Sequence, residues 1–385
     1  MHCVFWGRYQ YATDLLVTNS VTNDLNHMRA ALALARRGLG TTWPNPSVGC
    51  VLVRDGRVIG RGSTGLGGRP HAEPTALSMA GDSARGATAY VTLEPCCHWG
   101  HTPPCTEALI QAKVARVVIA TLDPDKRVDG LGVARLREAG INVEYRLLQD
   151  DARDDLQGFF LRINEKRPLI TLKLASTLDG KIATGTGKSQ WITGPEARRM
   201  AHVLRGRNDA VLIGVGTAIA DNPELTCRIV GFRESQIVRV VADSFLRTPL
   251  TSNLARTAGN TPLWFLICRR TDPSRRDAFI KLGATVIEIE SGEMGINLID
   301  GVKALALAGL TRVLVEGGGH MAASFIRADL VDRIAWLHAP AVMGGDGWPS
   351  VQGLGIPRLA MMPRFIPHRV TSLGPDTLTE FKRLF

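Results

Sequence analysis

The chain has 385 residues, of which 45% are hydrophobic and 21% charged. This balance is typical of a soluble globular protein and excludes a disordered chain, and no apolar run approaches the roughly 18 residues of a membrane-spanning helix. The net charge of +10 favours anionic partners. Charge alone does not separate nucleic acid from phosphorylated small molecules, but aromatic residues are only 6% and no Lys or Arg run exceeds two. We therefore expect neither nucleic acid nor membrane as a partner.

Length and cysteine content indicate the number of domains and the state of the cysteines. With about 150 residues per domain as a guide, the chain holds two or three domains, each able to bury a core. The seven cysteines are an odd number, and the first residues lack the charged and apolar segments of a targeting signal. We expect free thiols in the reducing cytoplasm. Residues 1–23 match no domain element either, and we interpret them as an N-terminal extension.

The predicted elements of the first half form an α/β pattern. Helical spacing begins at about Asn26, and Gly38 and Gly40 end that helix. Two strands, 48–54 and 57–60, flank Asp55-Gly56, which is a hairpin turn signal. A helix over 74–80, a strand over 89–93, a helix over 106–113 and a buried strand over 116–120 follow. This order predicts a compact α/β sandwich.

A polar, charged stretch between residues 147 and 168 marks the predicted domain boundary. We place a first domain at 24–166, with a linker from about 147, and a second domain at 167–385. Apolar strands then recur at 169–174, 210–213, 238–242, 263–268, 286–289, 313–315 and 334–339. Helical patterns between several of these strands predict a second α/β domain with a largely parallel sheet.

The strongest chemical signal is a set of potential zinc ligands in the first domain. His71-Ala72-Glu73 is followed by Glu94-Pro95-Cys96 and then by Cys105, which is the signature of hydrolytic deaminases with a lengthened cysteine spacing. A catalytic zinc takes three protein ligands and leaves the fourth position for water. We predict one Zn²⁺ per chain, held by His71, Cys96 and Cys105. Two of the predicted ligands, His71 and Cys105, lie at helix starts, where thiolate is favoured over thiol.

Glu73 is the predicted catalytic residue. Two thiolates neutralise much of the metal charge and weaken its effect on the pKa of bound water, so a separate proton carrier is needed. Glu73 lies two residues after His71 and is not itself a ligand. It can take the proton from water and pass it to the leaving ammonia.

Three alternatives remain open at this site. A closed structural zinc site would need a fourth ligand, and Cys97, His98 and His101 are available for it. Cys97 can also replace Cys96 as a ligand, although Cys96 is the cysteine that follows proline as in the signature. Asn45, in the segment 45–49, is a candidate to place an amide beside a ring substrate, or it belongs to a turn that starts a strand.

These motifs resemble those of the bifunctional deaminase/reductase family of riboflavin biosynthesis. The resemblance rests on segments 44–50, 70–73, 90–96 and 101–105, and it continues at 172–180, 189–193, 221–223 and 315–319. Cys97 departs from the serine usual in that family. Over residues 24–385 the resemblance implies a cytidine-deaminase-like three-layer sandwich followed by a dihydrofolate-reductase-like α/β domain. It also implies deamination of a phosphoribosylated diaminopyrimidinone and then NADPH-dependent reduction of its ribosyl group to ribityl.

The glycine-rich turn Glu316-Gly317-Gly318-Gly319 is the clearest physical signal of the second half. Between a strand and a helix start, such a turn offers bare N–H groups to a phosphate, although a tight turn explains the glycines equally well. The resemblance implies NADPH contacts at Ala175, Trp191, Thr217, Asp221, Ser244, Gly318, Gly319, His320, Met321, Ala322, Ala323 and Ser324. It does not indicate which arginine or lysine faces the 2′-phosphate of the cofactor.

The substrate of the second half is a phosphorylated pyrimidine by the same resemblance. Arg205 and Arg228 are candidates to grip its phosphate, because a guanidinium fork matches phosphate geometry; the alternative is an ordinary solvated arginine. The resemblance adds Ser189, Leu225 and Glu316 to the substrate site. Lys173 is a possible proton relay or a solvent-facing strand lysine.

Two rival functions remain, one of them from another class. The first is a nucleic-acid base deaminase with an accessory C-terminal domain. The second is a binding or regulatory protein that keeps the fold without the chemistry, against which the complete set of Glu73 and predicted zinc ligands argues. A homo-oligomer is possible.

Overall fold

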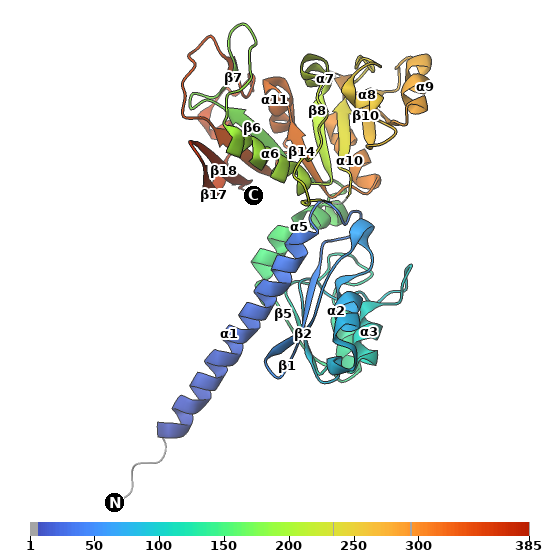
Figure 1. The fold of residues 1–385 in the computed structure, drawn as a ribbon, viewed down its shortest axis with the longest axis vertical. Coiled ribbons are helices and arrows are strands. Elements are labelled where there is room, and N and C mark those ends of the chain that lie inside the picture. Colours follow the sequence, from blue (N-terminus) through green and yellow to red (C-terminus); the bar gives the residue numbers. More distant parts are fainter. Residues whose placement is uncertain (1–6, 234, 293–294, 385) are drawn as a thin grey trace, which may run out of the picture. The chain divides into compact units, whose positions relative to one another are not determined.

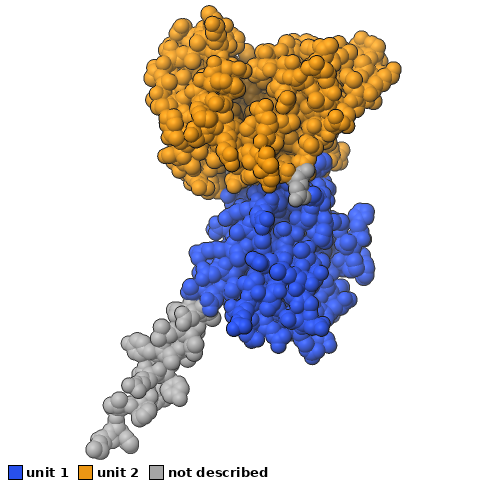
Figure 2. Space-filling model, in the orientation of Figure 1, with its two compact units in different colours: residues 1–164 blue, residues 165–385 orange. Residues whose placement is uncertain are grey.

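The computed structural model describes residues 7–233, 235–292 and 295–384. The chain divides into two compact units, 1–164 and 165–385 (Figure 2). The division falls two residues before the predicted domain boundary. Among the described residues, no helix combines the length and apolar character needed to cross a membrane.

The first unit is built on a five-stranded sheet with the strand order β2-β1-β3-β4-β5 (Figure 1). The hairpin β1/β2 and the pair β1/β3 are antiparallel, whereas β3/β4 and β4/β5 are parallel. Asp55 and Gly56, both with positive φ, form the hairpin turn at the predicted place. The strands are β1 (Gly49–Arg54), β2 (Arg57–Ser63), β3 (Thr88–Val91), β4 (Arg116–Ile119) and β5 (Asn142–Tyr145).

Helices cover both faces of this sheet and make three layers. One face packs against α1 and the start of α5, with Met28, Leu32 and Ala152 in the shared core. The other face packs against α2, α3 and α4 (Figure 1). The helices are α1 (Gly7–Arg37), α2 (Ala72–Ala80), α3 (Cys105–Gln111), α4 (Leu131–Glu138) and α5 (Gln149–Asn164), with 3₁₀ turns at Leu66–Gly68 and Gly81–Ala84.

Two glycines let the helices lie directly on the hairpin. A Cβ on Gly49 of β1 would stand 1.9 Å from the carbonyl oxygen of Ala31 in α1. A Cβ on Gly62 of β2 would stand 2.1 Å from the carbonyl oxygen of Ala72 in α2. Any side chain at these positions would push the backbones apart. The second contact fixes the start of α2 against the sheet, where two of the predicted site residues lie.

The structure corrects two expectations about this unit. The first helix begins at Gly7 rather than at about Asn26, because no Gly or Pro interrupts the chain between Arg8 and Arg37. The predicted N-terminal extension therefore carries helix from Gly7 onward, while its first six residues lie outside the described part. The predicted linker from about 147 is the helix α5: Asp150 and Asp151 occupy its first turn, where the helix dipole favours acidic residues, and Ala152, Leu156 and Leu161 are buried.

The second unit contains a nine-stranded sheet with the order β11-β10-β9-β8-β14-β6-β15-β18-β17. All seven predicted strands are present and lie parallel to one another. The antiparallel strands β18 and β17 extend one edge and were not predicted. The sheet strands are β6 (Leu169–Ser176), β8 (Ala210–Gly214), β9 (Val238–Ala242), β10 (Leu263–Cys268), β11 (Thr285–Ile289), β14 (Arg312–Glu316), β15 (Arg333–His338), β17 (Phe365–Leu373) and β18 (Asp376–Arg383).

The remaining elements of the second unit are helices and short strand pairs. The helices are α6 (Pro195–Gly206), α7 (Val215–Asp221), α8 (Asn253–Arg256), α9 (Pro273–Lys281), α10 (Leu298–Leu307) and α11 (Gly319–Arg327), with a 3₁₀ turn at Leu359–Met361. The short strands are β7 (Lys181–Ala183), which pairs with β16 (Trp348–Pro349), and β12 (Ser291–Gly292), which pairs with β13 (Gly295–Ile296).

The order of strands predicts a ligand site at the carboxyl ends of the parallel strands. The strand β14 comes late in the chain but inserts between β8 and β6, so the strand order reverses there. In open parallel sheets, ligands bind beyond the carboxyl ends of the strands near such a reversal. The glycine-rich turn lies at this point, between the end of β14 and the start of α11 (Figure 1).

Candidate functional site

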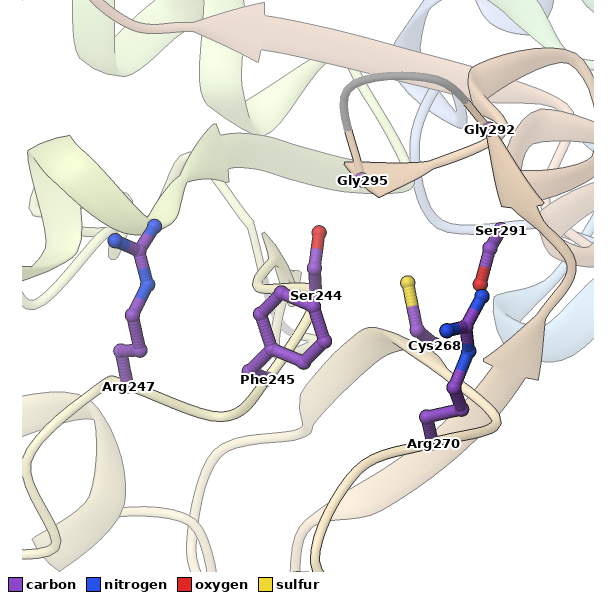
Figure 3. A pocket seen from close by; sticks show the side chains of 8 residues that line it. All are labelled: Ser244, Phe245, Arg247, Cys268, Arg270, Ser291, Gly292 and Gly295. Atoms are coloured by element: carbon purple, nitrogen blue, oxygen red, sulfur yellow. The ribbon is translucent and has the colours of Figure 1, made fainter.

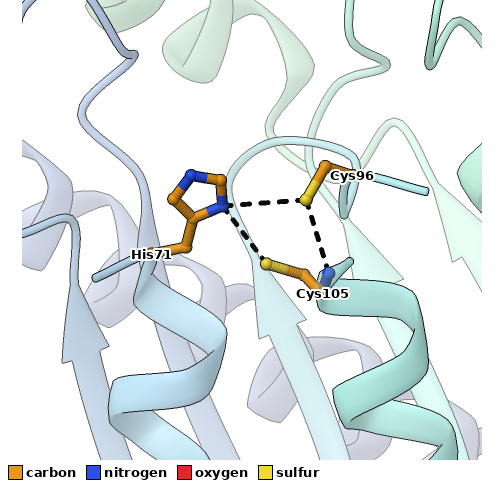
Figure 4. A group of neighbouring side chains, drawn as sticks. All are labelled: His71, Cys96 and Cys105. Carbon is orange, nitrogen blue, oxygen red and sulfur yellow. Dashed lines mark hydrogen bonds between the residues drawn. The ribbon is translucent and has the colours of Figure 1, made fainter. Parts of the chain in front are cut away.

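The predicted zinc ligands converge in the first unit. His71 precedes the first turn of α2, Cys105 begins α3, and Cys96 lies in the loop after β3. The imidazole points between the two sulfurs (Figure 4), with Nδ1 3.3 Å from Cys105 Sγ and 3.7 Å from Cys96 Sγ. The potential ligand atoms all lie within 4.8 Å of one another. One imidazole and two thiols therefore face a common centre.

These separations fit a tetrahedral zinc ion. Zn–S bonds of about 2.3 Å and Zn–N bonds of about 2.1 Å place tetrahedral ligand atoms about 3.6 Å apart. The two N–S distances in the structure, 3.3 and 3.7 Å, bracket that value. Three ligands leave a fourth position for water, as in catalytic rather than structural zinc sites.

The electrostatics of the cluster affect its two thiols in opposite directions and suit proton transfer at Glu73. Hydrogen bonds from Cys105 and His71 lower the pKa of Cys96 to about 4, whereas the neighbouring Cys96 thiolate and burial raise the pKa of Cys105. Glu73, in the first turn of α2, is 4% exposed. Burial and the charge of Cys96 raise the pKa of Glu73 to about 7, which suits a group that both accepts and donates a proton near neutrality.

Cys97 stands apart from the cluster. Its thiol donates to the carbonyl oxygen of Arg127 at 3.5 Å, and the group of potential metal ligands found among the described residues consists of His71, Cys96 and Cys105. His98 and His101 are not members of that group either. The geometry thus favours Cys96 as the ligand and an open site, although the ligand assignment stays a prediction.

A buried carboxylate that sequence patterns did not assign holds the cysteine loop. Glu94 accepts backbone N–H bonds from Gly130 and Val133 at 3.0 Å each and from Asp123 at 3.3 Å. It thereby anchors the chain two residues before Cys96. Asp123 is itself 7% exposed, and burial raises its pKa to about 7. A carboxyl with such a shift beside the cluster is a further candidate site residue.

Asn45 lies next to the segment that leads into α2. Its side-chain amide donates to the carbonyl oxygen of Gly68 at 3.0 Å. The left-handed Gly68 packs on Asn45, because a Cβ there would stand 2.6 Å from the Asn45 Cβ. This contact explains the residue structurally, and its proposed contact with a ring substrate stays a prediction.

A cleft of ≈ 1260 Å³ opens beyond the carboxyl ends of the strands in the second unit. It brings together most of the reductase residues expected from the sequence. They are Lys173, Ala175, Ser189, Trp191, Arg205, Thr217, Asp221, Leu225, Ser244, Glu316, Gly318, Gly319, His320, Met321 and Ser324.

Three expected residues lie outside the lining of this cleft. Ala322 and Ala323 face the core side of α11 and are at most 1% exposed. Arg228 lies on the surface, where it pairs with Glu224 at 3.7 Å and approaches His202 at 3.5 Å. Conversely, Arg198 lines the cleft without having been predicted, and its guanidinium lies over the Trp191 ring at 4.7 Å from the ring centroid.

A buried charge cluster of two strand residues and one residue of α6 lines the cleft. Arg205 binds Glu316 through both carboxylate oxygens, at 2.6 and 2.9 Å, and donates a further bond to the carbonyl oxygen of Thr226. Lys173 stands opposite Glu316 in the β6/β14 register, with its Nζ 4.0 Å from the carboxylate. Although burial opposes ionisation, these cations lower the pKa of Glu316 to about 2. Burial also lowers the pKa of Lys173.

Comparison with known proteins decides the family. Residues 21–121 match the zinc-binding region of cytidine and deoxycytidylate deaminases, and residues 168–379 match the RibD C-terminal domain. The riboflavin biosynthesis protein RibD of Aquifex aeolicus is 42% identical over 94% of this chain and 98% of its own length. The chain belongs to the RibD family. RibD of Escherichia coli K12 is 39% identical over 92% of this chain and 97% of its own.

Solved structures agree with this membership. Acinetobacter baumannii RibD is 36% identical, with a TM-score of 0.85 over 95% of this chain and all of that chain. A Thermotoga maritima diaminohydroxyphosphoribosylaminopyrimidine deaminase/5-amino-6-(5-phosphoribosylamino)uracil reductase is 32% identical, with a TM-score of 0.82 and the same coverage. The predicted fold class is confirmed. As a RibD, the protein is a bifunctional deaminase and reductase of riboflavin biosynthesis, with Zn²⁺ and NADPH as cofactors.

Proposed function

We propose that the first unit deaminates 2,5-diamino-6-(5-phosphoribosylamino)pyrimidin-4(3H)-one, with Glu73 as the catalytic residue and His71, Cys96 and Cys105 as zinc ligands. Zinc, when bound, lowers the pKa of the attacking water. Glu73 takes the proton of that water and delivers it to the amino group, which leaves as ammonia. Burial of Glu73 keeps its pKa at about 7, so one side chain serves both transfers.

The second unit then reduces the ribosyl group of the product to ribityl. NADPH supplies the hydride, so no side chain need be the donor. Lys173 is placed to relay the accompanying proton, because burial lowers its pKa and it lines the cleft. Glu316 and Arg205 form the floor on which the sugar lies, and Glu316 offers carboxylate oxygens to sugar hydroxyls.

The substrate is a phosphorylated small molecule, and Arg228 is the proposed contact of its phosphate. The paired guanidinium of Arg205 is held by Glu316 and Thr226, so most of its donors are already used. Arg228 is 65% exposed at its side chain and approaches only Glu224 and His202 among the described residues. A neighbouring cation with donors to spare suits a mobile phosphate. We also place the enzyme in the cytoplasm, a reducing compartment that suits its six described cysteines, which form no disulfide.

One observation carries the proposal: a buried Glu73 stands beside a three-ligand cluster on the same chain as a cofactor-sized cleft. A closed structural zinc site would give no reason for that carboxyl. A nucleic-acid base deaminase would share the cluster, but it would not need the cleft of the second unit.

A coupled assay of the zinc-loaded full-length chain tests the proposal. The phosphoribosylated diaminopyrimidinone is supplied with NADPH, and ammonia and nicotinamide absorbance are followed together. We expect ammonia release followed by NADPH consumption. Glu73→Gln should keep its zinc, slow ammonia release by about 10²- to 10⁴-fold and spare reduction of supplied deaminated substrate.

Glu138→Gln is the matched control, because this glutamate of the same unit is 74% exposed at its side chain and contacts only Arg135 among the described residues. It should behave as the parent enzyme. Near-normal deamination by Glu73→Gln would show that Glu73 is not the catalytic residue. Ammonia release without NADPH consumption would show that the second unit has a different function. The absence of both signals would exclude this substrate.

A further inference from the structure

The cleft of the second unit spans four strands of the sheet. Its lining extends from Ser244, which follows β9, to Ala175 on β6, and the strands β8 and β14 lie between them. Figure 3 shows the β9 end, where Ser244 and Arg247 also border a smaller hollow of ≈ 450 Å³. A loop that precedes α6, residues 189–193, also lines the cleft and carries the Trp191 ring.

Two contacts fix the end of this loop, but neither holds the ring. The buried carboxylate of Asp376 accepts the backbone N–H of Gly194 at 2.6 Å. The Arg198 guanidinium donates to the carbonyl oxygen of Thr193 at 2.8 Å. The indole of Trp191 is 69% exposed and forms no hydrogen bond with another described residue. An exposed side chain without such a bond exchanges between rotamers, so another contact is needed to keep the ring in one orientation.

The Arg198 guanidinium supplies that contact. It lies over the indole at 4.7 Å from the ring centroid, which is within the range of about 6 Å for a cation–π interaction. A planar guanidinium covers a ring face and donates to the Thr193 carbonyl at the same time, for which an ammonium group is less suited. One face of the indole is therefore covered by Arg198, and the other face is left for a ligand in the cleft.

The place of Arg198 on α6 agrees with this contact. Arg198 and Arg205 are about two helical turns apart, so they lie on the same face of the helix, and both line the cleft. Arg205 is paired with Glu316 at 2.6 Å. Arg198, by contrast, forms no ion pair with an acidic residue of the described ranges, so no carboxylate competes with the ring for its charge. The helix thus presents one arginine to the buried charge cluster and one to the loop.

We propose that Arg198 is a positioning residue of the reductase, which holds the Trp191 ring in the lining of the cleft so that its open face packs on bound NADPH. A ring that is already ordered in the free enzyme loses less conformational entropy when the cofactor binds. Arg198 acts through the ring rather than on the cofactor. The inference rests on the proposed placement of the cofactor in the cleft of the second unit.

Fluorine NMR of the full-length enzyme labelled with 5-fluorotryptophan reports on the ring before any ligand is added. The chain has seven tryptophans, and Trp191→Phe identifies the Trp191 signal by its loss. Arg198→Met, which keeps an unbranched side chain without the cation, should shift that signal and leave the others in place. The unshifted signals show that the variant is folded. Arg198→Lys should shift the Trp191 signal less, because it keeps a cation near the ring.

Arg199→Met is the matched control. Arg199 is the next residue of α6, is exposed, and forms no hydrogen bond or ion pair with another described residue. Its replacement removes the same charge from the same helix without uncovering the ring. It should shift no tryptophan signal and should bind NADPH as the parent does.

Calorimetric titration with NADPH tests whether Arg198 acts through Trp191. Arg198→Met should weaken binding about three- to fivefold, and Trp191→Ala should weaken it about tenfold. The double variant should bind as Trp191→Ala alone does, because the arginine then has no ring to hold.

The outcomes separate this inference from the placement on which it rests. An unshifted Trp191 signal in Arg198→Met would overturn the role of Arg198 while leaving the cleft as the cofactor site. Losses of affinity that simply add in the double variant would do the same, because Arg198 would then act on the cofactor directly. If Trp191→Ala left the affinity for NADPH unchanged, the placement of the cofactor against this ring would itself fail, and the inference with it.

Discussion

The zinc cluster and the reductase cleft differ in how the chain assembles them. The predicted ligands and Glu73 come from residues 71–105, and two of these ligands stand at the starts of short helices that pack on one sheet face. The cleft draws on residues from 173 to 352, brought together by the parallel strands and the loops after them. The first site is thus local in sequence, whereas the second is spread across half of the chain.

This difference governs how the two sites respond to change. The zinc cluster depends on a few atoms with fixed bonding distances, so losing one ligand removes its function at once. The cleft combines a buried charge cluster, which supports the fold, with exposed groups at its rim. Substitutions there should separate into effects on stability and effects on binding.

Replacement of a zinc ligand should give the largest effect. Cys96→Ser should lower zinc affinity by more than about 100-fold and abolish ammonia release, because a serine hydroxyl is a poor ligand for Zn²⁺. Reduction of supplied deaminated substrate should remain. Zinc content by atomic absorption and the two activities measured on the same preparation check this expectation.

Cys97→Ser is the matched control for that variant. Its thiol contacts the carbonyl oxygen of Arg127 rather than the cluster. Zinc content and deamination should stay within about twofold of the parent. The reverse pattern, with zinc lost on changing Cys97 and kept on changing Cys96, would identify Cys97 as the zinc ligand in place of Cys96.

The buried charge cluster should give the next largest effect, on stability. Glu316→Gln leaves Arg205 and Lys173 as buried cations without their carboxylate, and breaking such a pair costs about 3 kcal/mol. The pKa of folded Glu316 lies at about 2, below its ordinary value of 4.5. Its stabilising contribution is therefore fully present above about pH 4.5 and is lost as the pH falls toward 2.

Urea unfolding of the parent and variant chains measures this contribution. The difference in free energy of unfolding should be large at pH 7 and should shrink at pH 3, while amide hydrogen exchange at pH 7 should rise in β6 and β14. Glu290→Gln, which removes an exposed carboxylate from a surface pair, should change stability by less than about 0.5 kcal/mol. A gap between Glu316→Gln and the parent that stays constant with pH would contradict the buried-pair account.

The sequence predicted the local features better than the distributed ones. The hairpin around Asp55-Gly56 and all seven parallel strands follow from turn chemistry and apolar runs, and they are present. The antiparallel strands β17 and β18 were missed because neither carries an apolar run: β17 is largely exposed, and β18 is mostly half-buried. The polar start of α5 resembled a linker because acidic residues crowd its first turn.

Site prediction shows the same division. Sequence spacing brought out the predicted zinc ligands, which converge in the structure, because they belong to one short motif. The anchoring by Glu94 and the Arg205–Glu316 pair depend on contacts between residues far apart in the chain, which spacing does not reveal.

The smallest effect is expected at Arg228, which lies on the surface outside the lining of the cleft. Arg228→Ala should raise the reductase KM for the deaminated substrate about fivefold and leave kcat unchanged, because an exposed cation contributes equally to binding the substrate and the transition state. Steady-state kinetics compared with Arg207→Ala, an exposed arginine at the end of α6, would check this. An unchanged KM would show that Arg228 is a solvated surface arginine that does not contact the substrate. A parallel fall in kcat would instead show that Arg228 acts together with the buried charge cluster. His202 would then connect them, because it approaches Arg228 and feels the charge of Arg205.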